Sequence, residues 1–272
     1  MDWQGRHVIV TGGSSGIGKA TAKRLASQGA TISILARDPQ KLAEAQTEIA
    51  ATSRKTRVVT VAADLSDRLQ AEQAIATAVQ ELGPPDLLIT SAGIAHPGYF
   101  RELPIEIFEQ TMAINYFGTL YCIKAALPHM ESRGGQIVLL SSGAGLIGIY
   151  GYTPYSPSKF AIRGLAESLR GELKIWNIGV SIVYPADTDT PQLEAENRTK
   201  PAETKQITAT AQTWSADRMA AAIVTGIEKK AFVIAPGQEM SVLARLHSLI
   251  APGLNWYFDR IVSQVRSAPQ KP

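Results

Sequence analysis

Short apolar runs alternate with longer helical segments from the start of the chain to about residue 184, and a last apolar run at residues 231–235 follows a further helical segment. The apolar runs are rich in Val, Ile and Leu and show little polar alternation, as expected of strands that a parallel sheet buries on both faces. We predict strands at residues 7–11, 31–36, 57–63, 86–90, 136–141, 180–184 and 231–235. Helical periodicity predicts helices at residues 16–28, 39–52, 67–82, 104–132, 154–176 and 216–229.

Strand–helix alternation of this kind is typical of a doubly wound α/β fold. We therefore expect a Rossmann-type parallel sheet of about seven strands with helices on both faces, in three α/β/α layers. A chain of 272 residues suits one large domain of this class better than two ordinary domains, and no linker composition divides it. Ligands of such folds bind at the carboxyl ends of the strands.

The composition excludes several classes of function. The formal net charge is +3 without a Lys/Arg block, so we expect no nucleic-acid partner. The single cysteine, Cys122, allows no internal disulfide, and the four scattered histidines form no metal-ligand pattern, so we expect no metal. A strand pattern that begins at His7 leaves no room for a secretory signal, and no stretch runs to 18 uncharged apolar residues. These features predict a cytoplasmic protein.

The turn after the first predicted strand is rich in glycine and reads Thr11-Gly12-Gly13-Ser14-Ser15-Gly16-Ile17-Gly18. Glycines let a backbone approach a pyrophosphate closely, and the free N–H groups of a helix start attract the anion. Between the first strand and the first helix of an alternating chain, this pattern indicates a dinucleotide site. The spacing of Gly12, Ser14 and Gly16 also fits the nucleophile elbow of serine hydrolases. We reject that interpretation, because the turn in this chain follows the first strand and no His/Asp partners are apparent.

The end of the second predicted strand indicates which dinucleotide binds. NAD-binding folds usually carry an acid there, which holds the ribose 2′-hydroxyl and would repel a 2′-phosphate. This chain has Arg37, with Lys41 one turn into the next helix, and both can hold a phosphate. We predict NADPH/NADP+ as the cofactor. Asp64, after the third strand, is placed to accept from the adenine amino group, although helix capping by Ser66 and Asp67 is an equal alternative there.

A second set of residues has the chemistry that carbonyl reduction requires. Tyr155 and Lys159 lie four residues apart at the start of a predicted helix and so face the same side. A ketone needs a proton on its oxygen as hydride reaches carbon, and a neighbouring ammonium and the oxidised nicotinamide would both lower the tyrosine pKa toward neutrality. Ser142, thirteen residues before Tyr155, can hold the carbonyl oxygen, with Ser141 as the alternative. Asn115 is a poor helix former inside a predicted helix, which indicates a side-chain role such as holding a water in a proton relay.

The glycine turn, Asn115, Ser142, Tyr155 and Lys159, in this order, resemble the short-chain dehydrogenase/reductase family over residues 6 to 235. The resemblance implies that Asn115 supports a water relay, Ser142 positions the carbonyl, Tyr155 is the acid/base and Lys159 holds the ribose. The family usually has Asn-Asn-Ala-Gly after the fourth strand, where this chain has Thr90-Ser91-Ala92-Gly93, so we expect altered bracing of the sheet. The implied cofactor contacts are Gly12, Ser14, Ser15, Gly16, Ile17, Arg37, Lys41, Asp64, Leu65, Tyr155, Lys159 and Thr188.

Longer stretches of the chain resemble one branch of this family, which acts on sphingolipid precursors. They include the segment that starts at Tyr184-Pro185 and ends at Pro191, the run from Glu196 to Pro201, and residues 155–167. This resemblance implies NADPH-dependent reduction of the C3 ketone of 3-dehydrosphinganine to sphinganine, with a long-chain keto-lipid as substrate. The alternative within the family is another lipophilic ketone or secondary alcohol, of steroid or fatty-acyl type. The intact set of four residues argues against a nucleotide-sensing module without chemistry.

The carboxyl-terminal segment has an apolar stripe at helical spacing. We expect a dinucleotide-binding and catalytic domain at residues 1–238 and an amphipathic extension of that domain at residues 239–272. Pro252-Gly253 should interrupt the helix, and Trp256-Tyr257-Phe258 follow. A stripe with aromatic side chains suits a helix in the headgroup layer of a membrane, so we predict peripheral membrane contact between Met240 and Val262. The alternative is that the stripe packs on the core of this chain or on a second subunit of a homo-oligomer, a dimer or a tetramer.

Overall fold

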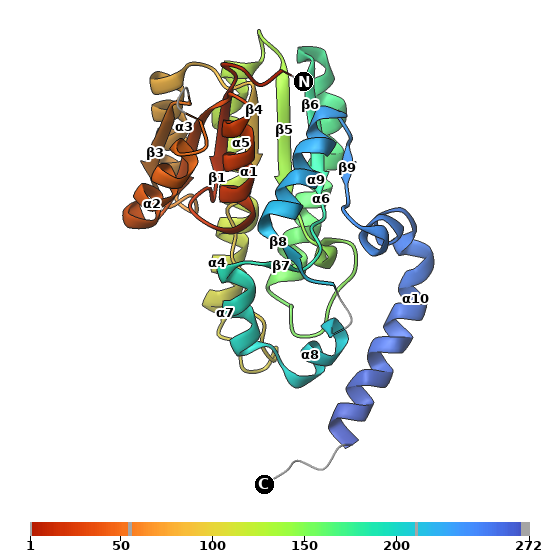
Figure 1. Ribbon diagram of the computed structural model, residues 1–272. Helices are drawn as coiled ribbons and strands as arrows, with labels where there is room; N and C mark the ends of the chain where they lie inside the picture. Colours follow the sequence, from red (N-terminus) through yellow and green to blue (C-terminus); the bar gives the residue numbers. More distant parts are fainter. Residues whose placement is uncertain (1, 54–55, 210–211, 268–272) are drawn as a thin grey trace.

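The computed structural model describes residues 2–53, 56–209 and 212–267. Within these ranges, seven parallel strands form the central sheet in the order β3-β2-β1-β4-β5-β6-β9 (Figure 1). This arrangement confirms the predicted doubly wound α/β fold. The strands are β1 (His7–Thr11), β2 (Thr31–Ala36), β3 (Val58–Ala62), β4 (Leu87–Thr90), β5 (Gly135–Leu140), β6 (Ile178–Val183) and β9 (Val233–Ile234).

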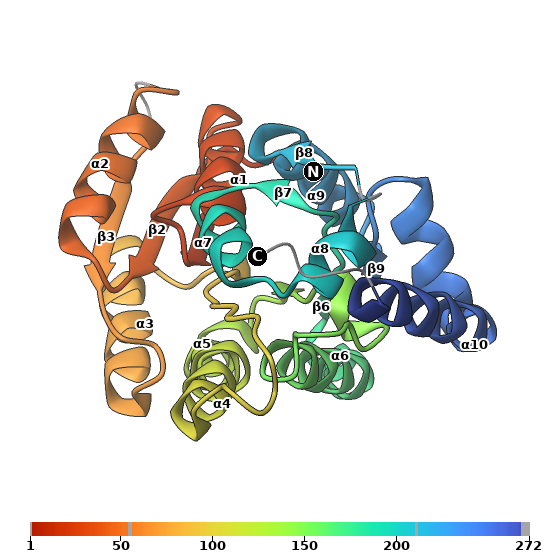
Figure 2. The same ribbon diagram turned by 90° about the horizontal axis from the view of Figure 1, so that it is seen from below.

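Helices cover both faces of the sheet. In Figure 2, α4 to α6 lie on one side and α1 and α9 on the other. The elements between the strands are α1 (Gly16–Ser27), α2 (Pro39–Ala50), α3 (Arg68–Leu82), α4 (Ile105–Met112), α5 (Thr119–Met130), α6 (Tyr155–Glu172) and α9 (Ala216–Glu228), with 3₁₀ turns at Gly143–Gly145 and Leu173–Trp176.

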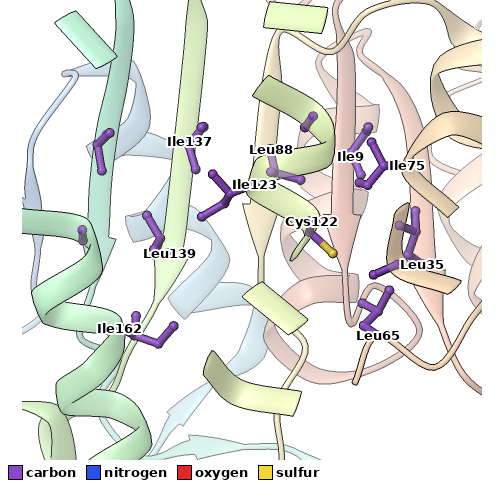
Figure 3. Close-up of a cluster of buried hydrophobic side chains, with 14 of the residues drawn as sticks. Ile9, Leu35, Leu65, Ile75, Leu88, Cys122, Ile123, Ile137, Leu139 and Ile162 are labelled. Carbon is purple, nitrogen blue, oxygen red and sulfur yellow. The ribbon is translucent and has the colours of Figure 1, made fainter. Parts of the chain in front are cut away.

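Two apolar layers hold the sheet between the helices, because successive strand residues point to opposite faces. On one face, Ile9, Leu88 and Ile137 pack with Ile123 of α5 and with buried residues of α3 and α6 (Figure 3). On the other face, Val8 and its strand neighbours pack against α1, α2 and α9. The central strands are therefore buried on both sides, which explains their lack of polar alternation.

The order of the strands reverses beside β1. β1 pairs with β2 on one edge and with β4 on the other, in parallel register from Val8 opposite Leu87 to Thr11 opposite Thr90. Right-handed crossovers then send the chain after β1 and the chain after β4 to opposite faces of the sheet. A crevice opens between these two connections at the carboxyl ends of the strands.

The structure differs from the prediction in two regions before the carboxyl-terminal helix. The single helix predicted at residues 104–132 is α4, a π-helical turn at Ala113–Gly118, and α5. The sequence also predicted nothing between residues 184 and 216, where the structure has β7 (Thr188–Asp189), α7 (Pro191–Thr199), α8 (Ala202–Thr208) and β8 (Trp214–Ser215). These short elements have little periodicity. β7 is a strand because it pairs with β8, and 24 residues of chain lie between the two strands.

The carboxyl-terminal helix α10 (Gln238–Ser267) runs through Pro252, so the predicted interruption at Pro252-Gly253 is wrong. Pro removes one backbone donor and bends a helix without always ending it, and α10 changes direction along its length in Figure 1. Met240 and Leu243 pack against the core, and His247 accepts a hydrogen bond from Arg163 of α6 at 2.9 Å. The predicted extension includes residues 268–272, which lie outside the described residues.

Candidate active site

The glycine turn between β1 and α1 has a backbone that other residues could not adopt without strain. Gly12 has φ +66°, and a Cβ there would lie 2.8 Å from Cα of Ala92. Gly16 has φ +53° at the first residue of α1. Ser15 is the N-cap of this helix but makes no side-chain capping bond. The first turn of α1 therefore presents backbone donors and a hydroxyl to the cavity, as an anion site requires.

A hydroxyl at the end of β1 braces the crevice. Thr11 Oγ1 accepts hydrogen bonds from the backbone N–H groups of Ser91 and Ala92, each at 3.1 Å. Thr90, where the related family usually has asparagine, donates through its hydroxyl to the carbonyl of Val138 at 3.3 Å on the neighbouring strand. Short hydroxyls thus connect β1, β4 and β5 at the carboxyl edge of the sheet.

Two cations lie at one end of the cavity. Arg37 and Lys41 both line it, and among the described residues neither forms an ion pair within 4 Å. The neighbouring Asp38 caps α2, since its carboxylate accepts from the N–H groups of Gln40 and Lys41. The positive charges at this end are therefore available to a phosphate.

Asp64 lies outside the cavity wall, and its carboxylate is occupied. It accepts from the N–H of Ser66 at 3.0 Å and from the Ser66 hydroxyl at 2.7 Å. Partial burial opposes ionisation, but these bonds and the charge of Arg37 hold the pKa of Asp64 below its ordinary value. The alternative interpretation, helix capping by Ser66 and Asp67, is confirmed for Asp67, whose carboxylate caps α3 by accepting from the N–H of Gln70 at 2.9 Å, whereas Ser66 donates to Asp64. The adenine contact stays a prediction.

Tyr155, Lys159 and Ser142 line the same cavity at its other end. Tyr155 and Lys159 lie on the first two turns of α6, with Nζ of Lys159 at 5.4 Å from the centre of the Tyr155 ring. Nζ also donates to the carbonyl of Leu140 at 3.0 Å. The hydroxyl of Ser141 donates to the carbonyl of Lys159 at 3.0 Å, whereas the hydroxyl of Ser142 accepts from the N–H of Ala144 at 3.2 Å and lowers the pKa of Tyr155. Both serines line the cavity, but Ser142 is the one that acts on Tyr155.

Burial dominates the electrostatics of this group. It lowers the pKa of Lys159 to about 8, although the charge of Glu196 acts in the opposite direction. Burial also raises the pKa of Tyr155 above its ordinary value, and Glu196 and Asp187 raise it further, while hydrogen bonds with Ser142 and Gln192 lower it. From the sequence we expected the pKa of Tyr155 to lie below its ordinary value. In the protein chain alone the desolvation of the phenolate outweighs any neighbouring charge.

Asn115 lies beside the cavity and is not part of its wall. It occupies the π-helical turn, where its amide accepts from the N–H of Ile94 at 2.8 Å and donates to the carbonyl of Ile94 at 3.0 Å. It also donates to the hydroxyl of Ser158 on α6 at 2.9 Å. Asn115 therefore connects the loop after β4 to the helix that carries Tyr155 and Lys159. The water relay remains a prediction.

The structure adds residues to this site that the sequence analysis did not select. Tyr152, Glu196, Gln192 and Asp187 all line the cavity near Tyr155. Glu196 belongs to a run that the sequence analysis singled out, but nothing in the sequence places it beside a tyrosine 41 positions earlier. The predicted residues in the cavity wall are Gly12, Ser14, Ser15, Gly16, Ile17, Arg37, Lys41, Leu65, Ser142, Tyr155, Lys159 and Thr188.

The fold and this cavity define a class of protein, the dinucleotide-binding oxidoreductases of the doubly wound α/β type. The uncapped start of α1 and the left-handed glycines fit a pyrophosphate, and a tyrosine, a lysine and a serine stand at the other end of the same cavity. A profile of the family described as short chain dehydrogenase matches residues 6–201. The chain belongs to the short-chain dehydrogenase/reductase family, whose chemistry uses a nicotinamide cofactor.

Individual relatives cover most of the chain. A 3-ketodihydrosphingosine reductase of Mus musculus is 44% identical over 91% of this chain and 76% of its own length. A protein of the same name from Dictyostelium discoideum is 40% identical over 94% of this chain and 81% of its own length. Among solved structures, levodione reductase superposes with a TM-score of 0.79 at 25% identity, over 85% of this chain and 96% of that one.

The buried position of Lys159 has a measurable consequence for stability. Between pH about 8 and 10.5 the unfolded lysine is protonated and the folded one is not, so the unfolded state binds more protons and stability rises with pH. Lys159→Met removes this charge, and we expect it to stabilise the protein at pH 7. The advantage of the variant should shrink by about 2 kcal/mol between pH 7 and pH 10. Urea unfolding at a series of pH values measures this difference.

The exposed Lys174→Met variant serves as the control and should show no such pH-dependent advantage. An advantage of Lys159→Met that stays constant from pH 7 to pH 10 would show that the pKa of this lysine is not depressed.

Proposed function

We propose that this protein reduces the C3 ketone of 3-dehydrosphinganine to sphinganine with NADPH. The observation that carries the proposal is the arrangement of Tyr155, Lys159 and Ser142 in one cavity with the glycine turn of α1. The relatives named for this substrate, from an animal and from Dictyostelium discoideum, support the choice of ketone. Within the described part of the chain, no helix is long and apolar enough to cross a membrane.

Each residue of the group has a distinct task in this reaction. A nicotinamide held in this cavity would supply hydride to the carbonyl carbon. Tyr155 donates its phenolic proton to the carbonyl oxygen, and the hydroxyl of Ser142 holds the same oxygen in place. Lys159 binds the ribose hydroxyls, and its ammonium stabilises the tyrosinate that remains. Asn115 positions α6 through Ser158, so it acts through Tyr155 and Lys159.

The preference for NADPH rests on the free cations at the other end of the cavity. We assign the 2′-phosphate to Arg37 and Lys41, because neither cation has a carboxylate within 4 Å among the described residues and Asp38 is used for capping α2. The pyrophosphate is assigned to Gly12, Ser14, Ser15, Gly16 and Ile17 at the start of α1. The remaining cofactor contacts of the proposal are Asp64, Leu65 and Thr188.

The function is tested by steady-state oxidation of NADPH with 3-dehydrosphinganine and with a panel of steroid and fatty-acyl ketones. We expect 3-dehydrosphinganine to have the highest kcat/KM. Tyr155→Phe should abolish turnover but leave NADPH affinity within a few fold, since it removes the proton donor and no phosphate contact. A higher kcat/KM for a ketone of another class would contradict the substrate, and activity of the Phe variant within threefold of the parent would contradict the role of Tyr155.

The cofactor preference is tested at Arg37. We expect the unmodified protein to use NADPH far better than NADH, and Arg37→Asp to remove or invert this preference. The lost charge-assisted contact should cost about 1.5–3 kcal/mol in NADPH binding. Arg133→Asp makes the same charge change at an exposed turn before β5 and should leave the preference intact. Equal catalytic efficiency of the unmodified protein with both cofactors would refute the assignment.

The proposal extends to a membrane contact through α10. Met240 and Leu243 face the core, so only part of the predicted stripe is buried. Val242, Leu246 and Leu249 are exposed on the first half of the helix, and Trp256 and Tyr257 on the second. Arg260 lies 5.9 Å from the Trp256 ring, which places a cation beside the aromatic residues. Exposed apolar and aromatic side chains with a nearby cation suit the headgroup layer, where a long-chain ketone resides.

Vesicles containing anionic phospholipid test this contact by co-sedimentation. Leu249→Glu with Trp256→Glu should strongly reduce binding, because both side chains are exposed, at 78% and 63%. Ile175→Glu is the matched control, since Ile175 is 77% exposed outside α10, and it should bind like the parent protein. If the parent does not bind vesicles and the α10 variant dissociates an oligomer in ultracentrifugation, the apolar face is an interface between copies of this chain.

A further inference from the structure

A carboxylate lies in the cavity wall beside the reacting group, and the chemistry above gives it no task. Glu196 is on α7, one of the elements that the sequence analysis did not predict, and only 8% of the residue is exposed. It nevertheless lines the cavity together with Tyr152, Tyr155 and Gln192. A carboxylate is almost never this deeply buried unless it has partners that repay its lost hydration.

The partners of Glu196 within the described chain are neutral. The hydroxyl of Tyr152 donates to Oε2 at 2.6 Å, and the side-chain amide of Gln192 donates to Oε1 at 2.9 Å. No Lys, Arg or His of the described residues lies within 4 Å of this carboxylate. A carboxylate has about four acceptor positions, so these two donors fix its orientation and leave room for a further donor from the cavity.

The charge of Glu196 acts directly on the catalytic group. Tyr152 donates to Glu196 through its hydroxyl, and its ring lies 5.6 Å from the Tyr155 ring, centre to centre. Glu196 raises the pKa values of both Tyr155 and Lys159, and its effect on Tyr155 is larger than that of Asp187, the other carboxylate nearby. The carboxylates of Glu196 and Asp187 therefore act on the tyrosine end of the cavity, and Arg37 and Lys41 lie at the other end.

From this geometry we infer that Glu196 binds an ammonium group next to the carbonyl that is reduced, which makes the protein selective for α-amino ketones. The inference rests on the proposed function, because 3-dehydrosphinganine carries its amino group on C2, one carbon from the C3 ketone. A group that holds this ammonium must lie close to Tyr155, as Glu196 does. The buried anion gains a charged donor, and the substrate is oriented by two fixed points, its oxygen and its nitrogen.

The bound ammonium also makes proton donation by Tyr155 more favourable. In the protein alone, Glu196 opposes formation of the Tyr155 phenolate. An ammonium bound to Glu196 neutralises that effect at the moment when Tyr155 releases its proton to the ketone oxygen. A neutral ketone in the same place would leave the carboxylate charge uncompensated. Discrimination against ketones without the amine is thus expected in kcat as well as in KM.

A purely structural role for Glu196 would be to hold α7 over the cavity through Tyr152. Two variants separate the roles. Glu196→Gln removes the charge but keeps an oxygen that accepts from Tyr152, and Tyr152→Phe removes that hydrogen bond but keeps the charge. Glu194→Gln is the matched control, because the Glu194 side chain lies on the same helix, is 71% exposed and pairs with Arg198.

The experiment measures kcat/KM with NADPH for 3-dehydrosphinganine and for its N-acetyl derivative, which has the same ketone and chain but no charge. We expect Glu196→Gln to lower the preference for the free amine at least tenfold. Tyr152→Phe should keep that preference even where it lowers both rates, and Glu194→Gln should match the parent protein. Thermal unfolding of each variant confirms that it is folded.

Each outcome has one interpretation. An equal loss on both substrates in Glu196→Gln, or a lost preference in Tyr152→Phe with an intact Glu196, would assign Glu196 a structural role and overturn the inference. If Asp187→Asn loses the preference for the free amine and Glu196→Gln keeps it, the ammonium binds Asp187, and this result would also overturn the inference. A parent protein that does not reduce 3-dehydrosphinganine at all would contradict the proposed function itself, which the first measurement reveals before any variant is compared.

Discussion

The reversal of strand order between β1 and β4 is the constraint on which the site depends. The connections that follow these two strands run to opposite faces of the sheet. The space between the connections stays open and forms a crevice at the carboxyl ends of the strands. Thr11 keeps the two strand ends together by accepting from the N–H groups of Ser91 and Ala92. The glycine turn enters this crevice from one side, and the loop held by Asn115 enters it from the other.

The two ends of the cavity carry different charged side chains. The end with Arg37 and Lys41 presents cations that have no carboxylate within 4 Å among the described residues, whereas the end with Tyr155 contains Glu196 and Asp187. At the Tyr155 end, burial lowers the pKa of Lys159 to about 8, which makes its ammonium costly in the protein alone. Ligands that carry the opposite charges stabilise such a site. Catalytic sites often lower the stability of the unliganded protein in this way.

The segment after β6 gives the site its substrate side. β7, α7 and α8 cross the carboxyl edge of the sheet, and Figure 2 shows them between the two helical layers. Thr190 caps α7 through the N–H of Leu193, and Tyr152 holds the same helix through Glu196. α8 is tied to the loop before α6 by Thr204, whose hydroxyl donates to the carbonyl of Tyr150. The wall that faces the substrate is therefore attached at several points to the segment that carries Tyr155.

The sequence by itself determined the sheet, its flanking helices and the two chemical motifs. Strands such as β1 and β2 were predicted to the residue, because burial on both faces leaves an uninterrupted apolar run, and the glycine turn and the Tyr155–Lys159 pair are local patterns. Only the tertiary structure decided that Ser142 is the serine that lowers the Tyr155 pKa, that Asn115 braces a loop, and that Glu196 lies beside the reacting group. These facts arise from contacts between segments 13 to 44 residues apart, and a hydrogen bond between distant side chains leaves no periodicity in the sequence. The same reason applies to α10, where contacts with the core partly bury Met240 and Leu243 and leave Leu249 exposed.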